Sequence, residues 1–284
     1  MQQINARVES YTNVRPDAPL PEQYANYMTS VLTGDLGTSI WHNEPVSMIM
    51  AKAIPWTVFV SSVSLILTFV IGICLGAIMA YYEGSQFDVS STILTTLLNA
   101  IPYYIAAIIL LYFLGFQGGF FPTGGRFDPD TTPGLNLSFI LSIIHYGALP
   151  IFSFVITGID PLGMRGNSIS VLGSDYVRVA RLRGLSDMRI SIRYVAHNAI
   201  LPFYTGLLIS IGGLIGGSVI MEQIFSYPGV GYYIFESISS RDYPLMMGGF
   251  LVLTVCVVIG VYIADLTYGK VDPRAGTGDQ RESY

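Results

Sequence analysis

Charged residues are missing from five long stretches of the sequence, and this pattern limits the fold more than any other feature. No Asp, Glu, Lys or Arg occurs at positions 53–82, 89–125, 131–159, 194–221 or 243–264. A helix that crosses a bilayer needs roughly 20 consecutive apolar residues, so each stretch is long enough for one span. The sequence therefore predicts an all-α, polytopic helical membrane protein with five transmembrane helices.

The composition argues against other classes of protein. Only 12% of the 284 residues are charged and 51% are hydrophobic, whereas about a quarter of the residues of a soluble domain are charged. A transmembrane β-barrel would show alternating segments of about ten residues rather than long apolar blocks. The net charge of -5 comes without a long run of either sign, so no nucleic-acid partner is indicated.

Prolines, glycines and polar stretches place the expected elements. The five spans are expected near 55–81, 91–116, 137–160, 201–224 and 245–268, with an ordered loop at 115–135 and a polar loop at 225–244. Pro55 is expected at the start of the first helix, and Pro102 is expected to kink or interrupt the second. Gly72 and Gly76 form a GxxxG pair that permits close helix approach.

Basic residues predict the orientation of the chain. Lys and Arg are enriched in cytoplasmic loops, and nine of the fourteen fall on the side that holds 83–90, 161–199 and the tail. We therefore expect a multi-pass protein of the cell membrane. Its extracytoplasmic N-terminal segment would be 1–53, its transmembrane domain 54–268 and its cytoplasmic tail 269–284.

The loop at 161–199 is basic and reads as a helix, a tight turn and a second helix. Its core sequence is DYVRVARLRGLSDMRISIRYVAHNAILP. Gly184 can end the first helix in the left-handed conformation, and Ser186 or Asp187 can cap the second. A short helix with the small residue Ala180 fits insertion into a groove on a cytoplasmic partner. A basic amphipathic helix that lies on anionic lipid headgroups fits the composition equally well.

This loop resembles the cytoplasmic coupling loop (the EAA loop) of ABC-importer permeases, in the longer-spaced form of the oligopeptide/dipeptide permease family. Three other regions resemble the same family in order: PLPEQYANYM with GDLGTSI, then GGSVIMEQIFSYPGVGYYIFESISSRDYP, then DLTYGKVDPR. The chain has Arg178-Val179-Ala180 where the family pattern has Glu-Ala-Ala, so only Ala180 and Gly184 match the core letters of the loop. The family has six spans, and the resemblance implies that this chain lacks the first.

The resemblance also implies which residues carry the function. The ATPase-coupling loop would contain Asp175, Tyr176, Arg178, Ala180, Arg181, Arg183, Gly184, Leu185 and Ser186. A second loop that carries a family motif would contain Glu222, Phe225, Pro228, Gly229, Gly231, Asp242, Tyr243 and Pro244.

A protein of this family would be the transmembrane permease subunit of an ATP-driven ABC importer and would form half of the pathway for dipeptides or oligopeptides. Its partners would be a second related permease, two ATP-binding subunits and an extracytoplasmic substrate-binding protein. Nickel or a sugar is the alternative cargo within the same family. A self-contained secondary carrier or channel is the alternative outside it, and such a protein needs intramembrane coupling groups or an internal repeat.

Motifs for catalysis, cofactors and metals are absent from the sequence. The two lysines, Lys52 and Lys270, precede Ala and Val, so there is no GK[ST] P-loop, and HExxH and GxSxG are missing as well. We therefore expect a chain that is not an enzyme and holds no cofactor or metal. Cys74 and Cys256 lie in apolar stretches without CxxC spacing and are expected to be buried, inert thiols.

Four titratable residues lie within or near the expected spans. For Asp160, Asp265 and Glu222, which fall near span ends, helix capping or pairing is favoured over a proton relay. His145 lies well inside an apolar stretch, where a structural histidine bonded between helices is favoured over a metal or proton site.

Overall fold

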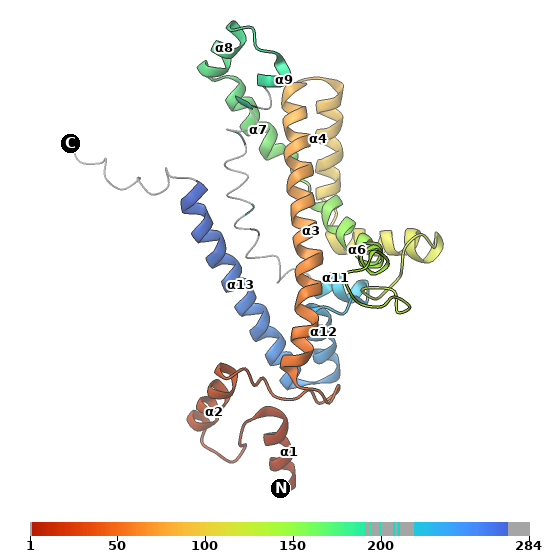
Figure 1. The fold of residues 1–284 in the computed structure, drawn as a ribbon, viewed down its shortest axis with the longest axis vertical. Helices are drawn as coiled ribbons and strands as arrows, with labels where there is room; N and C mark the ends of the chain where they lie inside the picture. Colours follow the sequence, from red (N-terminus) through yellow and green to blue (C-terminus); the bar gives the residue numbers. More distant parts are fainter. Residues whose placement is uncertain are drawn as a thin grey trace, which may run out of the picture. The chain divides into compact units, whose positions relative to one another are not determined.

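The computed structural model describes residues 2–190, 193–194, 199, 207, 210 and 219–271 (Figure 1). These residues form helices and loops, and their one extended pairing is an isolated bridge between Thr38 and Pro45. The all-α fold that the sequence predicts is confirmed.

Within 2–190 and 219–271, short connections join the helices, apart from the loops at 33–45 and 118–136. In order they are α1 (Gln2–Thr12), α2 (Leu20–Leu32), α3 (Val46–Tyr81), α4 (Gln86–Asn99), α5 (Tyr103–Leu110), the π-helix η1 (Leu111–Gln117), α6 (Leu137–Gly158), α7 (Pro161–Leu172), α8 (Asp175–Leu182), α9 (Asp187–Ile190), α11 (Val219–Ile224), α12 (Val230–Ser240) and α13 (Tyr243–Val271).

Three helices of the described part are long and apolar enough to cross a membrane. They are α3, α6 and the part of α13 from Tyr243 to Ile263. A fourth span results if α4 and the helical segment Tyr103–Gln117 count as one broken span. The predicted span at 201–224 lies outside the described residues except for positions 207, 210 and 219–224.

The predicted interruption at Pro102 is confirmed. Helix α4 ends at Asn99, Pro102 precedes the first residue of α5, and the two helical segments are bent by 92°. Proline lacks an N–H and disfavours helical geometry in the residue before it, so the helix stops before Ile101.

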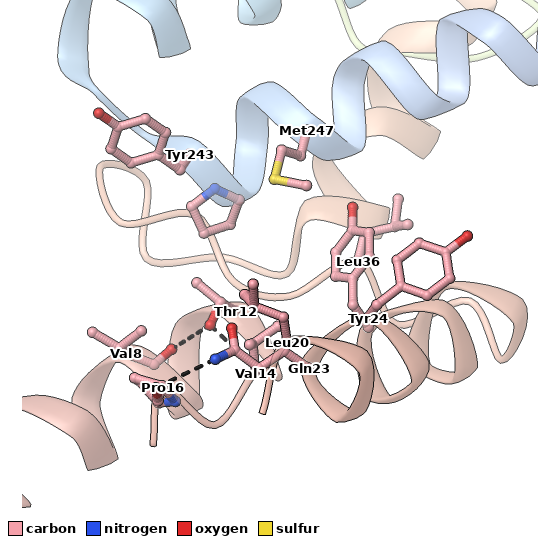
Figure 2. A pocket seen from close by; sticks show the side chains of 12 residues that line it. Val8, Thr12, Val14, Pro16, Leu20, Gln23, Tyr24, Leu36, Tyr243 and Met247 are labelled. Atoms are coloured by element: carbon pink, nitrogen blue, oxygen red, sulfur yellow. Dashed lines mark hydrogen bonds between the residues drawn. The ribbon is translucent and has the colours of Figure 1, made fainter. Parts of the chain in front are cut away.

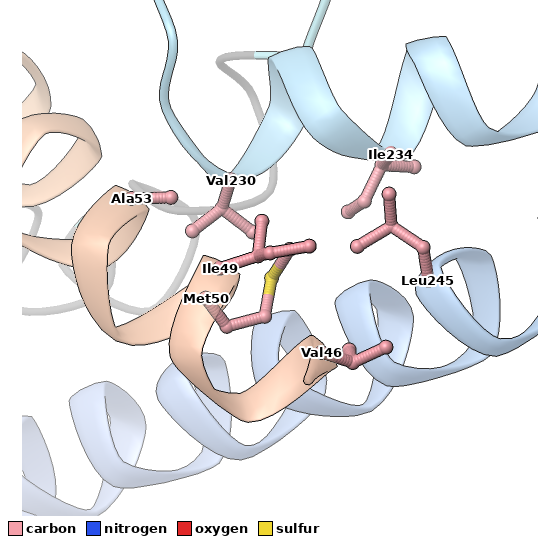
Figure 3. Close-up of a cluster of buried hydrophobic side chains, with 7 residues drawn as sticks. All are labelled: Val46, Ile49, Met50, Ala53, Val230, Ile234 and Leu245. Atoms are coloured by element: carbon pink, nitrogen blue, oxygen red, sulfur yellow. The ribbon is translucent and has the colours of Figure 1, made fainter. Parts of the chain in front are cut away.

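The expected start of the first span at Pro55 is wrong, because α3 begins at Val46 and carries Pro55 in its interior. Val46, Ile49, Met50 and Ala53 follow the i, i+3, i+4, i+7 spacing of one helical face, and all four are buried. They form a cluster with Val230, Ile234 and Leu245 (Figure 3). Burial of this face extends the helix upstream of the proline.

The expected polar loop at 225–244 is also wrong in part, because it contains the helix α12. Val230 and Ile234 are four residues apart and face the same buried cluster. The polar residues of this stretch suggested a loop, although the stretch contains an amphipathic helix of three turns.

The chain divides into two compact units. The first contains residues 1–61, 114–148 and 215–257, and the second contains 62–113, 149–214 and 258–284. Helices α3, α6 and α13 contribute residues to both units. Each unit holds one of the two loops that the sequence singles out.

Met50 and Met48 test the buried face of α3, because Met50 is 1% exposed and Met48 is 50% exposed. We expect Met50→Ala to lower the free energy of unfolding by about 2–5 kcal/mol, since it leaves a cavity in the cluster. Thermal unfolding of the purified protein in detergent measures the effect. Met48→Ala is the matched control, and an equal loss in both variants would contradict the buried face.

Candidate functional site

Helix α8 ends in a left-handed turn at Gly184, as the sequence predicts. Gly184 has φ +71° and donates its N–H to the Arg181 carbonyl at 2.9 Å. Leu185 donates to the Ala180 carbonyl at 3.3 Å. These two bonds make a Schellman motif, which satisfies carbonyls at the end of the helix and reverses the chain toward α9.

The loop from α7 to α9 has a small core of its own. Its buried residues are Val177, Ala180 and Ile190, and Val171, Leu172, Leu185 and Tyr194 pack against them. Ser186 lies before α9, and its carbonyl accepts the N–H groups of Arg189 and Ile190. The end of α7, helix α8 and helix α9 are therefore one packed body, which we call the coupling body (residues 171–190).

The structure gives Ala180 a different place from the one expected. Ala180 is 2% exposed and faces the coupling body, so its side chain is not available to a partner. The exposed apolar residues of α8 are Tyr176, Val179 and Leu182, and Leu182 is 82% exposed. Leu182 is not among the residues that the family resemblance implies, although an apolar residue between Arg181 and Arg183 is a visible signal in the sequence.

An ion pair attaches α7 to the start of α4. Arg165 donates from Nε to Asp88 Oδ1 at 2.6 Å and from an Nη atom to Oδ2 at 2.7 Å. Asp88 is 2% exposed and also accepts the N–H of Gly84 at 3.0 Å. The hydrogen bonds to Asp88 raise the pKa of the Arg165 guanidinium above its ordinary value.

Small residues on α3 let α7 approach closely. A Cβ on Gly76 would overlap the Pro161 carbonyl and the side chain of Met164. The close approach predicted from the GxxxG pair is confirmed at Gly76. Asp160 caps α7 by accepting the N–H of Leu162 at 3.1 Å, which confirms the capping role.

In the first unit, a buried carboxylate joins α3, α11 and α12. Glu222 is fully buried and accepts the Thr57 hydroxyl at 2.7 Å and the Tyr232 N–H at 2.9 Å. Thr57 in turn accepts the Val230 N–H at 2.8 Å. The expected pairing of Glu222 is confirmed, and its partners satisfy a group that would be costly to bury alone.

The two glycines of the PGVG sequence let the chain pass close to this carboxylate. A Cβ on Gly229 would overlap Thr57 Oγ1 and the Glu222 carboxylate, and one on Gly231 would overlap the backbone of Val219. Glu222, Gly229 and Gly231, which the sequence places in one motif, are thus brought together in space.

Phe225 and Pro228, two further residues of this motif, belong to the same turn. Phe225 is buried, and the Pro228 carbonyl accepts from the Arg126 guanidinium at 3.1 Å. That guanidinium lies over the Trp56 ring at 5.2 Å, a cation–π distance. Burial raises the pKa of the Tyr227 phenol, and the nearby Glu222 raises it further.

Asp242 connects the turn before α13 to the loop before α3. It is 1% exposed and accepts the Ser39 hydroxyl at 2.5 Å and the Trp41 N–H at 3.0 Å. It also caps α13 through the Leu245 N–H at 3.2 Å. Tyr243 and Pro244 lie beside it, and both line a pocket of about 440 Å³ among α1, α2 and the start of α13 (Figure 2).

His145 bonds the Phe120 carbonyl at 2.9 Å, which fits the structural histidine that the sequence predicts. The expectation of buried cysteines is wrong for Cys74, which is exposed on α3, while Cys256 is partly buried. An apolar position on a span can face lipid, so low charge alone does not imply burial within the protein. The side chain of Asp265 lies outside the described part of the chain.

Comparison with known proteins identifies related sequences over most of the chain. The model of the family "Binding-protein-dependent transport system inner membrane component" matches residues 72–277. The oligopeptide transport system permease protein AppB of Bacillus subtilis is 37% identical over 89% of this chain and 79% of its own length. The dipeptide transport system permease protein DppB of Escherichia coli K12 is 30% identical over 91% and 81%.

Solved structures share the fold at low sequence identity. An inward-facing structure of the MetNI methionine ABC transporter matches with a TM-score of 0.61 and 15% identity, over 79% of this chain and 97% of that one. A structure of an amino acid ABC transporter with histidines matches with a TM-score of 0.55 and 11% identity, over 79% and 94%. At this level of identity the likeness concerns the fold.

Gly229 and Gly166 test the close approach around Glu222. We expect Gly229→Ala to destabilise the permease by about 1–3 kcal/mol, because the added methyl group overlaps Thr57 and Glu222. Chemical denaturation in detergent measures the loss. Gly166→Ala is the control, since a methyl group added there in α7 would meet no atom within 4 Å and the substitution favours helix. Equal stability of the two variants would rule out the tight turn.

Proposed function

The chain belongs to the family of binding-protein-dependent transport system inner membrane components, and on this basis we propose that it is the permease subunit of an ABC importer for peptides. The family model covers more than half of the chain, and the named relatives are peptide permeases. The subunit would sit in the cell membrane and form half of a pathway with a second, related permease.

The names of the relatives support peptides as the cargo of this permease. Both relatives described above are named for oligopeptide or dipeptide transport, and each aligns with about nine-tenths of this chain. In a binding-protein-dependent system, the substrate-binding protein selects the cargo before the permease receives it. Nickel and sugar remain the alternatives to be separated by experiment.

The coupling body is the proposed contact with the ATP-binding subunits. The observation that carries this assignment is the exposed apolar surface of α8, where Val179 and Leu182 lie among arginines. Exposed apolar side chains on a short helix gain free energy when a partner covers them. The side chain of Ala180 would support this surface from within the coupling body rather than touch the partner.

A packed body suits the transfer of movement from one subunit to another. When two ATP-binding subunits close on nucleotide, a helix seated in each would be displaced with them. The coupling body shares a core from Val171 to Ile190, so α7 would follow α8. The sequence has no P-loop, so ATP hydrolysis would take place in the partner subunits.

The orientation follows from the same assignment. The coupling body and the C-terminal tail would be cytoplasmic, in agreement with the bias of Lys and Arg. The loops at 1–52, 115–135 and 225–244 would face outward and receive the substrate-binding protein. The pocket beside Tyr243 and Pro244 lies within this proposed outer surface.

A secondary carrier is less well supported by the described residues. Such a protein needs a titratable group that can exchange ions or protons within the membrane. Glu222 and Asp160 accept hydrogen bonds from neighbouring groups, and His145 bonds a carbonyl. These contacts fit structural roles.

Leu182 tests the contact with the ATP-binding subunits. We expect Leu182→Asp to reduce their co-purification with the permease at least about tenfold, because an aspartate cannot replace the buried apolar contact. Leu135→Asp, at a fully exposed position in the loop before α6, is the control. If Leu182→Asp retained the ATP-binding subunits but lost binding to anionic vesicles, α8 would be a lipid-binding helix instead.

Uptake by the reconstituted complex tests the energy source and the cargo. We expect liposomes that contain both permeases, the ATP-binding subunits and the substrate-binding protein to take up radiolabelled dipeptides or oligopeptides only with ATP. Dissipation of ion gradients should leave uptake unchanged. Uptake of nickel or a sugar in place of peptides would reassign the cargo, and uptake driven by an ion gradient without ATP would contradict the importer.

A further inference from the structure

The segment from Ile159 to Arg165 is attached to both ends of α4. At the first turn of α4, Asp88 binds Arg165 through two hydrogen bonds. At the last residue, Asn99 donates from its amide to the Ile159 carbonyl at 3.0 Å. Two separated attachments prevent one element from pivoting on the other, so α4 and the start of α7 are held as one piece.

The ion pair between Arg165 and Asp88 is strong and has a defined geometry. A guanidinium and a carboxylate that meet through two parallel bonds fix distance and angle together. Asp88 is almost completely shielded from solvent and receives a third bond from Gly84 in the turn between α3 and α4. Such a shielded pair loses far more when one partner is removed than an exposed pair does.

The first turns of α7 also pack on α3 without room for adjustment. The backbone of Pro161 and the side chain of Met164 lie against Gly76, where even a methyl group does not fit. Met164 is fully buried. Helix α7 is thus held by α3 through close packing and by α4 through the ion pair.

Helix α4 is not continued in a straight line by the helical segment that follows it, because the chain turns sharply between the two. The 92° bend between α4 and the following helical segment means that a displacement of α4 is not simply continued along one straight span. The coupling body begins at the end of α7, only two turns beyond Arg165.

We propose that Arg165 and Asp88 are positioning residues that make α4 move together with the coupling body when ATP binds to the partner subunits. This inference rests on the proposed function, since it assumes that ATP-binding subunits displace α8. The ion pair is the element that converts a movement of the loop into a movement of a membrane helix.

Distance measurements between α4 and α7 in the complete transporter test the linkage. Ser90→Cys on α4 and Ser170→Cys on α7 provide exposed sites for spin labels, with Cys74 and Cys256 replaced by Ser. The distance is measured without nucleotide and after trapping with ATP and vanadate. With the native ion pair, we expect the same distance in both states.

Arg165→Met removes the ion pair, and we expect trapping then to change the distance by several ångströms, because the coupling body moves without α4. Arg165→Lys keeps the charge but not the two parallel bonds, so we expect a change in distance smaller than that of Arg165→Met. Lys52→Met, which removes the exposed pair between Lys52 and Glu44 on another part of the chain, is the control and should behave as the unsubstituted protein.

Two results would overturn the linkage: a distance that already changes on trapping with the native pair, or an unchanged distance in Arg165→Met. Both presuppose a complex that contains the ATP-binding subunits. If the unsubstituted permease did not retain those subunits, the proposed function would fail instead, so the two failures are distinguishable. A variant that misfolds is recognised by loss of the complex. If Arg165→Met misfolds, Asp88→Asn replaces it, because it removes the charge and keeps the size of the side chain. An unchanged distance on trapping in Asp88→Asn would then overturn the linkage.

Discussion

Buried carboxylates that must find hydrogen-bond donors hold this protein together. In a chain with so little charge, Asp88, Glu222 and Asp242 are nonetheless almost fully removed from solvent. An unpaired charge in such surroundings is costly, so each carboxylate collects donors from at least two elements. The partners are a guanidinium for Asp88, and hydroxyl and backbone N–H groups for Glu222 and Asp242.

Each of these carboxylates also holds a turn at the end of a helix. Glu222 closes the turn before α12, Asp242 the turn before α13, and Asp88 the turn after α3. In the importer proposed above, turns held in this way would keep their internal shape while the helices between them move.

Several features follow from local chemistry and could be predicted from the sequence. The break before α5 follows from Pro102, and the end of α8 follows from Gly184. The helical character of the chain follows from long stretches without charge. The start of α3 could not be predicted in this way, because Pro55 is a stronger local signal than the buried face upstream of it.

Neighbouring residues along the chain were enough to establish a helical membrane protein, the places where several of its helices end and the family that it resembles. The packed structure was needed to show that Ala180 faces inward and Leu182 outward. It was also needed to pair Thr57 with Glu222 across 165 positions and Asp88 with Arg165 across 77. A buried charge selects its partner by proximity in space, and proximity between distant residues arises only when the helices pack.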